Sequence, residues 1–243
     1  MRLKFYGKTD IGRRRKMNQD SIAMDGKQKL FIVADGMGGH KGGEVASKMA
    51  CETLKRFVVE HSKVQDIDPR ELLEKGFQEA SRMVHLEANK PSEEEDLKGM
   101  GTTMVAIYVF EGRVYIANVG DSRAYLFTQG EIWAITDDHS LINEQLRRGI
   151  ITEAESATVG KNVITRSIGF QPHVEVDVFD RKLLTGESYL LCSDGLHGLV
   201  SDEWILNRYK QGELDRFVEE LVSESNNQGG DDNVSCLFVQ VEP

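Results

Sequence analysis

Five aspartates of this 243-residue chain share one kind of neighbourhood. Each stands beside Gly, Asn or Ser, where an apolar run predicted as a strand ends or begins: Asp20, Asp35, Asp121, Asp194 and Asp232. Carboxylates at one edge of stacked sheets can converge in a single cleft, where their charges repel one another strongly. Divalent cations remove that repulsion, and ligands that are all oxygen favour Mg²⁺ or Mn²⁺. The pattern therefore predicts a metal centre.

The stretch from Phe31 to Glu44 shows this arrangement most clearly. Apolar residues lead to Asp35, a glycine-rich turn follows, and a helical pattern opens at Val45. Strand, loop and helix can cradle a phosphate, but a carboxylate at the strand end repels phosphate unless a cation lies between them. The alternatives are an ordinary Asp-Gly turn, a dinucleotide fingerprint whose spacing is one residue too long, and a Walker loop, which needs Ser or Thr after Lys41.

Composition excludes several other classes of function. The net charge of −10 argues against a nucleic-acid-binding surface, and the apolar fraction of 40% is ordinary for a soluble globular protein. Three cysteines without a secretory signal fit a reducing cytoplasm, and no apolar run approaches the length of a membrane span. We therefore expect a cytoplasmic protein that binds neither membrane nor nucleic acid.

The elements that must position the aspartates alternate between strand and helix patterns. Strands are predicted over residues 2–7, 21–24, 29–35, 102–110, 113–119, 123–127, 132–135, 174–179, 187–192 and 234–241. Helices are predicted over residues 44–60, 69–86, 203–209 and 213–223, with two short helices within 137–161. We expect Ser140, Thr152 and Asp202 to cap helices. Short strands joined by tight turns predict antiparallel sheet.

Seven segments in order resemble the metal-dependent protein Ser/Thr phosphatases of type 2C, in their compact bacterial form. The matching segments are residues 15–20, 33–40, 101–103, 118–123, 138–140, 193–196 and 230–235. The resemblance covers essentially the whole chain and implies a single catalytic domain over residues 1–243. It implies an α+β fold, a four-layer αββα sandwich of two mostly antiparallel sheets flanked by helix pairs, with a small flap subdomain at about 137–161.

The resemblance also implies a binuclear Mn²⁺ or Mg²⁺ centre. Asp35 resembles the bridging carboxylate, and Gly36 offers its backbone carbonyl oxygen. Asp194 and Asp232 resemble ligands of the other core positions. Two such ions about 4 Å apart lower the pKa of a bridging water towards roughly 7 and clamp an in-line displacement. The hydroxide would then attack phosphorus directly.

The remaining site residues are implied in the same way. Asp121 resembles the acid that, with Asp194, holds a weaker third ion, and Asp20 a ligand reached through water. Arg15 resembles the arginine that grips the substrate phosphate. The leaving alkoxide needs a proton, and many eukaryotic relatives carry His where this chain has Met37. His40 or a metal-bound water is the candidate donor, and a His40 that only shapes the loop is an equal alternative.

We therefore expect a phosphatase that hydrolyses phosphoserine and phosphothreonine in proteins phosphorylated by a Ser/Thr kinase. Such an enzyme would act in signal transduction, and we expect a monomer. The alternatives are a phosphatase-like binding module without turnover and a metal-dependent hydrolase of small phosphoesters. The presence of all five aspartates favours an active enzyme. A cysteine phosphatase is excluded, because none of the three cysteines is followed by Arg at the C-x₅-R spacing.

Overall fold

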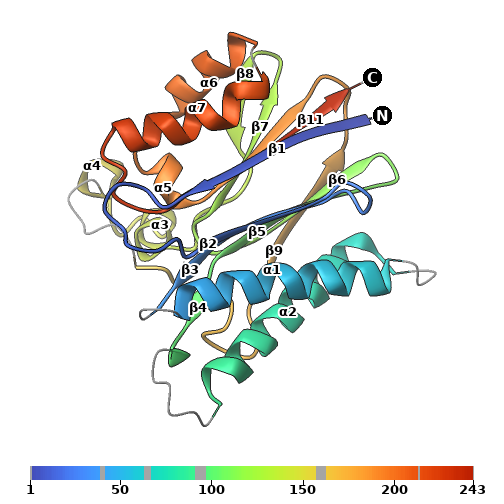
Figure 1. The fold of residues 1–243 in the computed structure, drawn as a ribbon, viewed down its shortest axis with the longest axis vertical. Helices are drawn as coiled ribbons and strands as arrows, with labels where there is room; N and C mark the ends of the chain where they lie inside the picture. Colours follow the sequence, from blue (N-terminus) through green and yellow to red (C-terminus); the bar gives the residue numbers. More distant parts are fainter. Residues whose placement is uncertain are drawn as a thin grey trace.

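The computed structural model describes residues 2–38, 42–62, 67–90, 97–156, 163–212 and 214–242. In this part of the chain, two β-sheets pack face to face with helices outside them (Figure 1). The first sheet has the order β1-β11-β10-β7-β8. Its strands are β1 (Arg2–Asp10), β7 (Arg123–Thr128), β8 (Glu131–Ala134), β10 (Ser188–Cys192) and β11 (Val234–Glu242).

The second sheet has the order β2-β3-β5-β6-β9, with the short β4 paired to β3. Its strands are β2 (Asp20–Asp25), β3 (Leu30–Met37), β4 (Gly101–Thr102), β5 (Met104–Phe110), β6 (Arg113–Val119) and β9 (Asp177–Lys182). All these strand pairs are antiparallel, as predicted.

Helices cover the outer face of each sheet. α1 (Gly42–His61) and α2 (Pro69–Ala88) lie on the second sheet, and α6 (Asp202–Lys210) and α7 (Leu214–Asn227) lie on the first (Figure 1). The short helices are α3 (Leu141–Arg147), α4 (Glu153–Ser156) and α5 (Asp194–His197), which lie at one end of the sandwich. No helix in the described ranges has the length and apolar character needed to cross a bilayer. The layers are those of the predicted αββα sandwich.

The side chains of β3 explain how the layers aim the first predicted metal ligand. Leu30, Ile32 and Ala34 pack towards α1 and α2, whereas Phe31 and Val33 pack between the sheets. Both faces of the strand are buried, so its sequence is continuously apolar. Because side chains alternate along a strand, the next residue on the inner face is Asp35. The strand therefore directs this carboxylate between the sheets.

The predicted strand at 174–179 begins three residues too early. The observed strand β9 starts at Asp177. Val174 instead bonds to a side chain of α2, donating its N–H to Gln78 Oε1 (3.2 Å) and accepting from Gln78 Nε2. This contact between residues 96 positions apart cannot be read from local sequence.

Two of the three predicted helix caps are confirmed. Ser140 and Thr152 each accept a hydrogen bond from the backbone N–H three residues along the chain. For α6 the prediction is wrong by one residue. Ser201 is the cap and accepts from the N–H of Trp204 (3.3 Å), while Asp202 is the first helical residue.

The core between the sheets should dominate stability. Leu237 is fully buried there, so Leu237→Ala should lower the free energy of unfolding by about 2–5 kcal/mol. The matched control is Leu86→Ala on α2, where the leucine is 49% exposed and the loss should stay below about 0.5 kcal/mol. Urea unfolding curves measure both, and equal losses would contradict the layer assignment.

Candidate active site

The five predicted aspartates come together around Asp35, and one of them, Asp194, is the first residue of α5. Asp20 on β2 is the direct register partner of Asp35 on β3. Asp121 follows β6, Asp194 begins α5 with one residue between it and the end of β10, and Asp232 precedes β11. The charges of the other four carboxylates all act on Asp35. We call this set, which draws on both sheets, the aspartate cluster.

The aspartate cluster is electrostatically strained. Burial, together with the neighbouring carboxylates, raises the pKa of Asp20 to about 7 and that of Asp121 to about 7. The same causes raise the pKa of Asp194 and move the pKa of Asp35 well above its usual value. One buried oxygen of Asp20 and one of Asp194 have no hydrogen-bond partner among the described residues. A divalent cation would satisfy both features.

The carboxylates of the aspartate cluster do not form a complete coordination shell for a metal ion. Within the described ranges, no three His, Cys, Asp or Glu side chains are grouped closely enough to hold a metal ion by themselves. Hard cations such as Mg²⁺ commonly keep several waters and use few carboxylates. A cation here would therefore draw part of its coordination from water and from backbone carbonyl oxygen.

The backbone of Asp35 is fixed by two threonines. Thr103 donates its N–H to the Asp35 carbonyl oxygen (2.8 Å), and its hydroxyl accepts from the Asp35 N–H (3.0 Å). The Thr102 hydroxyl donates to the same carbonyl oxygen (2.8 Å). The motif at residues 101–103 thus holds the main chain of Asp35 and leaves its carboxylate for the cluster.

Gly36 is required by a close crossing of two backbones. A Cβ at this position would lie 2.0 Å from the carbonyl oxygen of Gly43 on α1 and 2.4 Å from that of Gln19. The Gly36 N–H also donates to the Gln19 carbonyl oxygen (3.1 Å). Because only glycine fits, the end of β3 and the start of α1 meet directly beside Asp35.

A hydrogen bond joins the two sheets at the cluster. Ser193, which follows β10 of the first sheet, donates its hydroxyl to Asp20 Oδ2 on the second sheet (2.8 Å). The Ser193 hydroxyl also accepts the N–H of Ser235 at the start of β11 (2.9 Å). Next to it, a Cβ at Gly195 would lie 1.9 Å from the Asn233 carbonyl oxygen. These contacts fix the position of α5, and hence of Asp194, relative to the second sheet.

Arg15 reaches the cluster through an ion pair with Asp232 (Nη2 to Oδ2, 2.6 Å). Its loop is held by the side chain of Asn233. That amide donates to the carbonyl oxygens of Ile11 (2.9 Å) and Met17 (3.0 Å) and accepts from the Gln19 N–H (2.8 Å). The guanidinium is half-exposed, so it keeps N–H groups available to an anion.

Two histidines without a sequence-predicted role hold the turn that carries Asp121. The ring Nδ1 of His139 accepts a hydrogen bond from the N–H of Gly120 (3.1 Å), and the backbone N–H of His139 donates to the Gly120 carbonyl oxygen (2.9 Å). His197 on α5 donates from Nε2 to the carbonyl oxygen of Asp121 (3.0 Å). His139 lies in the matching segment 138–140, whereas no sequence motif contains His197.

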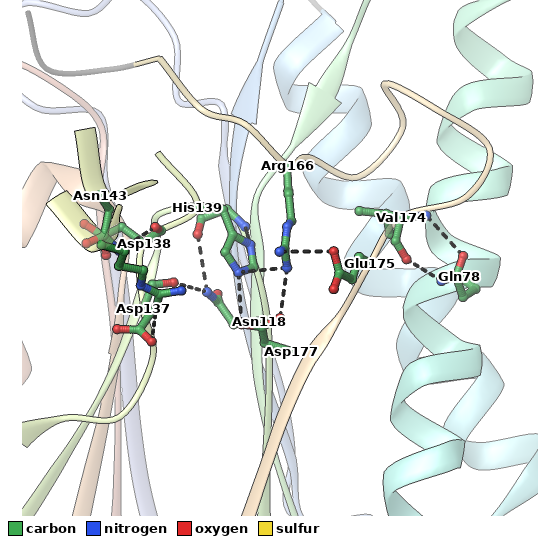
Figure 2. A network of polar contacts seen from close by, with 12 residues as sticks. Gln78, Asn118, Asp137, Asp138, His139, Asn143, Arg166, Val174, Glu175 and Asp177 are labelled. Atoms are coloured by element: carbon green, nitrogen blue, oxygen red, sulfur yellow. Dashed lines mark hydrogen bonds and ion pairs between the residues drawn. The ribbon is translucent and has the colours of Figure 1, made fainter. Parts of the chain in front are cut away.

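Figure 2 shows how the same region anchors the predicted flap. His139 Nε2 contacts Asp177 Oδ2 on β9 (3.2 Å), and Asp177 Oδ1 accepts from Arg166 (2.9 Å). The Arg123 guanidinium bonds both oxygens of Asp138 (2.8 and 2.7 Å). Burial lowers the pKa of His139, which keeps its ring neutral and able to accept from Gly120. The first residues of the predicted flap are therefore hydrogen-bonded to the turn that carries Asp121 and to the strand that follows it.

The structure does not describe every residue of the predicted site and flap. His40, the candidate proton donor, lies outside the described residues, as do residues 157–161 of the flap. In the described part of the flap, α3 buries none of its side chains.

The sequence pattern of protein phosphatase 2C matches residues 9–238. The chain belongs to this family. A serine/threonine phosphatase, stp, of Listeria innocua is 39% identical over 241 residues, which cover 96% of this chain and 94% of that protein. The protein phosphatase PhpP of Streptococcus pneumoniae is 33% identical over 238 residues, which cover 96% of this chain and 95% of that protein.

Solved structures of the family share the fold. The serine/threonine phosphatase PstP/Ppp of Mycobacterium tuberculosis has a TM-score of 0.90 at 32% identity, with 100% of both chains covered. The catalytic domain of PstP in complex with two manganese ions has a TM-score of 0.87 at 32% identity, with 99% of both chains covered. The predicted family, fold class and enzyme class, a protein Ser/Thr phosphatase, are confirmed.

Removing one carboxylate from the cluster should stabilise the metal-free phosphatase. The raised pKa of Asp20 means that its ionisation costs stability as pH rises from the usual aspartate value, 3.8, to about 7. Asp20→Asn should therefore raise the Tm of EDTA-treated protein by several degrees at pH 8, at about 2–4 °C per kcal/mol, and less at pH 5. Mn²⁺ should raise the Tm of the wild type more than that of the variant. Differential scanning fluorimetry measures both.

Asp180→Asn is the matched control. Asp180 is paired with Arg70 (2.8 Å) and Arg113, and hydrogen bonds from both lower its pKa. Its replacement should lower the Tm or leave it unchanged. A lower Tm for metal-free Asp20→Asn at pH 8 would contradict the strain assigned to the aspartate cluster.

Proposed function

We propose that residues 1–243 form one catalytic domain that hydrolyses phosphoserine and phosphothreonine in proteins, with Mn²⁺ or Mg²⁺ held by the aspartate cluster. The observation that carries this proposal is the convergence of five carboxylates from two sheets, two of them with an unbonded buried oxygen. The names of the bacterial relatives, which are serine/threonine phosphatases, support the substrate class. The manganese complex of PstP supports the choice of ion.

The proposed ligands are Asp20 through water, Asp35, the carbonyl oxygen of Gly36, Asp121, Asp194 and Asp232. Asp35 and Gly36 are consecutive residues of β3, and the glycine crossing holds them beside the start of α1. Asp194 is close enough to interact with both Asp35 and Asp232. We assign Asp121 with Asp194 to a weaker third ion. Bound cations would supply a water nucleophile that is active at neutral pH and would neutralise phosphate charge.

Arg15 is proposed to hold the phosphate of the substrate. Its ion pair with Asp232 keeps the guanidinium beside the cluster, and its planar fork can hold two phosphate oxygens. The Asn233 contacts fix the loop on which Arg15 stands, so less entropy is lost when the phosphate binds.

We infer that the substrates are products of a Ser/Thr kinase and that the enzyme acts as a monomer in signal transduction in the bacterial cytoplasm. The relatives reported above are bacterial. All three cysteines are buried and unpaired, which fits a reducing compartment.

The test is phosphate release from a phosphothreonine peptide. Activity should need Mn²⁺, should vanish with EDTA, and should fall by at least about 10³-fold in Asp194→Ala, because the variant loses a shared metal ligand. The control is Asp231→Ala, an exposed aspartate that pairs with Arg14 (2.9 Å) beside Asp232 and should keep its activity.

Two outcomes would decide against the proposal. Activity that survives EDTA would exclude metal-assisted hydrolysis. Turnover of p-nitrophenyl phosphate without any turnover of phosphopeptides would favour the hydrolase of small phosphoesters, and Mn²⁺ binding without turnover of either would favour the binding module.

His40 is proposed as the general acid. His40→Ala should lower the turnover of a phosphothreonine peptide by about 10²-fold or more, because the alkoxide would leave without a proton. Its Mn²⁺ affinity, measured by calorimetry, should stay unchanged. Full turnover in His40→Ala would mean that water, and not His40, donates the proton to the leaving alkoxide.

A further inference from the structure

A groove of about 420 Å³ lies between β3 and the segment that links the flap to β9. Met37 at the end of β3 forms one side, and nine residues between Ile164 and Glu175 form the rest. The volume falls within the range of sites that hold small ligands or single side chains of a partner, roughly 300–1,000 Å³. We call this feature the flank groove.

The flank groove adjoins the aspartate cluster through the main chain. Met37 follows Asp35 by two residues on β3. Ile168, within the groove segment, exchanges two backbone hydrogen bonds with Thr102 (3.0 and 2.8 Å). The Thr102 hydroxyl in turn donates to the carbonyl oxygen of Asp35 (2.8 Å). A polypeptide whose phosphate reached Asp35 would therefore continue close to the groove.

The walls of the groove are already fixed. The Ser81 hydroxyl on α2 donates to the Gln171 carbonyl oxygen (2.8 Å) and accepts the Gly169 N–H (3.0 Å). Gln78, one turn earlier on α2, holds both backbone groups of Val174 (Figure 2). A groove that is formed before binding loses little entropy when it is filled.

The groove offers apolar contact beside polar side chains. Phe170 is 73% exposed, so most of its ring is available to a partner. Met37, Ile164 and Val174 also line the groove. Arg166, which also lines the groove, is paired with Asp177 (2.9 Å) and Glu175 (3.1 Å), as Figure 2 shows. A negatively charged side chain would have to compete with both carboxylates for Arg166, whereas an apolar one would cover Phe170.

We propose that the flank groove binds an apolar side chain of the substrate protein, a few residues from the phosphorylated Ser or Thr, and so selects among phosphoproteins. This inference rests on the proposed function, because it extends the same site. It assigns a specificity role to Phe170, which lies outside the aspartate cluster.

The test is a series of phosphothreonine peptides in which one leucine replaces serine at each position from three before to three after the phosphothreonine. We expect one leucine position to raise kcat/KM about tenfold over the all-serine peptide, mainly through KM. In Phe170→Ala that ratio should fall to about one. Trp133→Ala, which removes an aromatic ring that is 57% exposed on β8, should keep the wild-type ratio.

Binding separates this inference from the proposed function. The same series with a non-hydrolysable phosphonate in place of the phosphate is titrated in Mn²⁺ by fluorescence anisotropy. The leucine preference and its loss in Phe170→Ala should appear in Kd even where turnover is absent. A flat leucine series, or a preference that persists in Phe170→Ala, would overturn the inference. Failure of the wild type to hydrolyse any phosphoester would overturn the proposed function instead.

Discussion

The half-buried carboxylate of Asp35 stands opposite the buried carboxylate of Asp20 because β2 and β3 pair in a fixed register. Asp20 and Asp35 are direct partners across antiparallel strands, where like charges destabilise a sheet. Phe31 and Val33, which precede Asp35 on the same face of β3, are buried between the sheets, so the register cannot slip without exposing the core. The core thus holds together a cluster that electrostatics alone would separate.

The surrounding structure serves to keep that cluster in place. Glycine positions such as Gly36 and Gly195 let backbones meet where any Cβ would clash. Ser193 connects the sheets through Asp20, and His197 connects α5 to the Asp121 turn. The polar side chains around the aspartates therefore fix backbone positions, while the carboxylates keep oxygens free for a cation.

The fold and the aspartates could be predicted from the sequence because their signals are local. Apolar runs that end in Asp and Gly marked the strand ends, and the ordered motif segments implied both the fold and the site. The early start predicted for β9 was wrong because Gln78, far along the chain, holds Val174. The hydrogen bond from His197 to the Asp121 turn depends on long-range packing, and so does the flank groove around Phe170. Neither can be read from the spacing of residues along the chain.

If the fold forces these carboxylates together to hold divalent cations, the protein should bind Mn²⁺ by itself. Mn²⁺ binding, counted by electron paramagnetic resonance of the free ion, tests it without any substrate. We expect at least two ions per wild-type chain and the loss of at least one of them in Asp35→Asn. Wild-type protein that binds no Mn²⁺, or an Asp35→Asn variant that binds as many ions as the wild type, would contradict it.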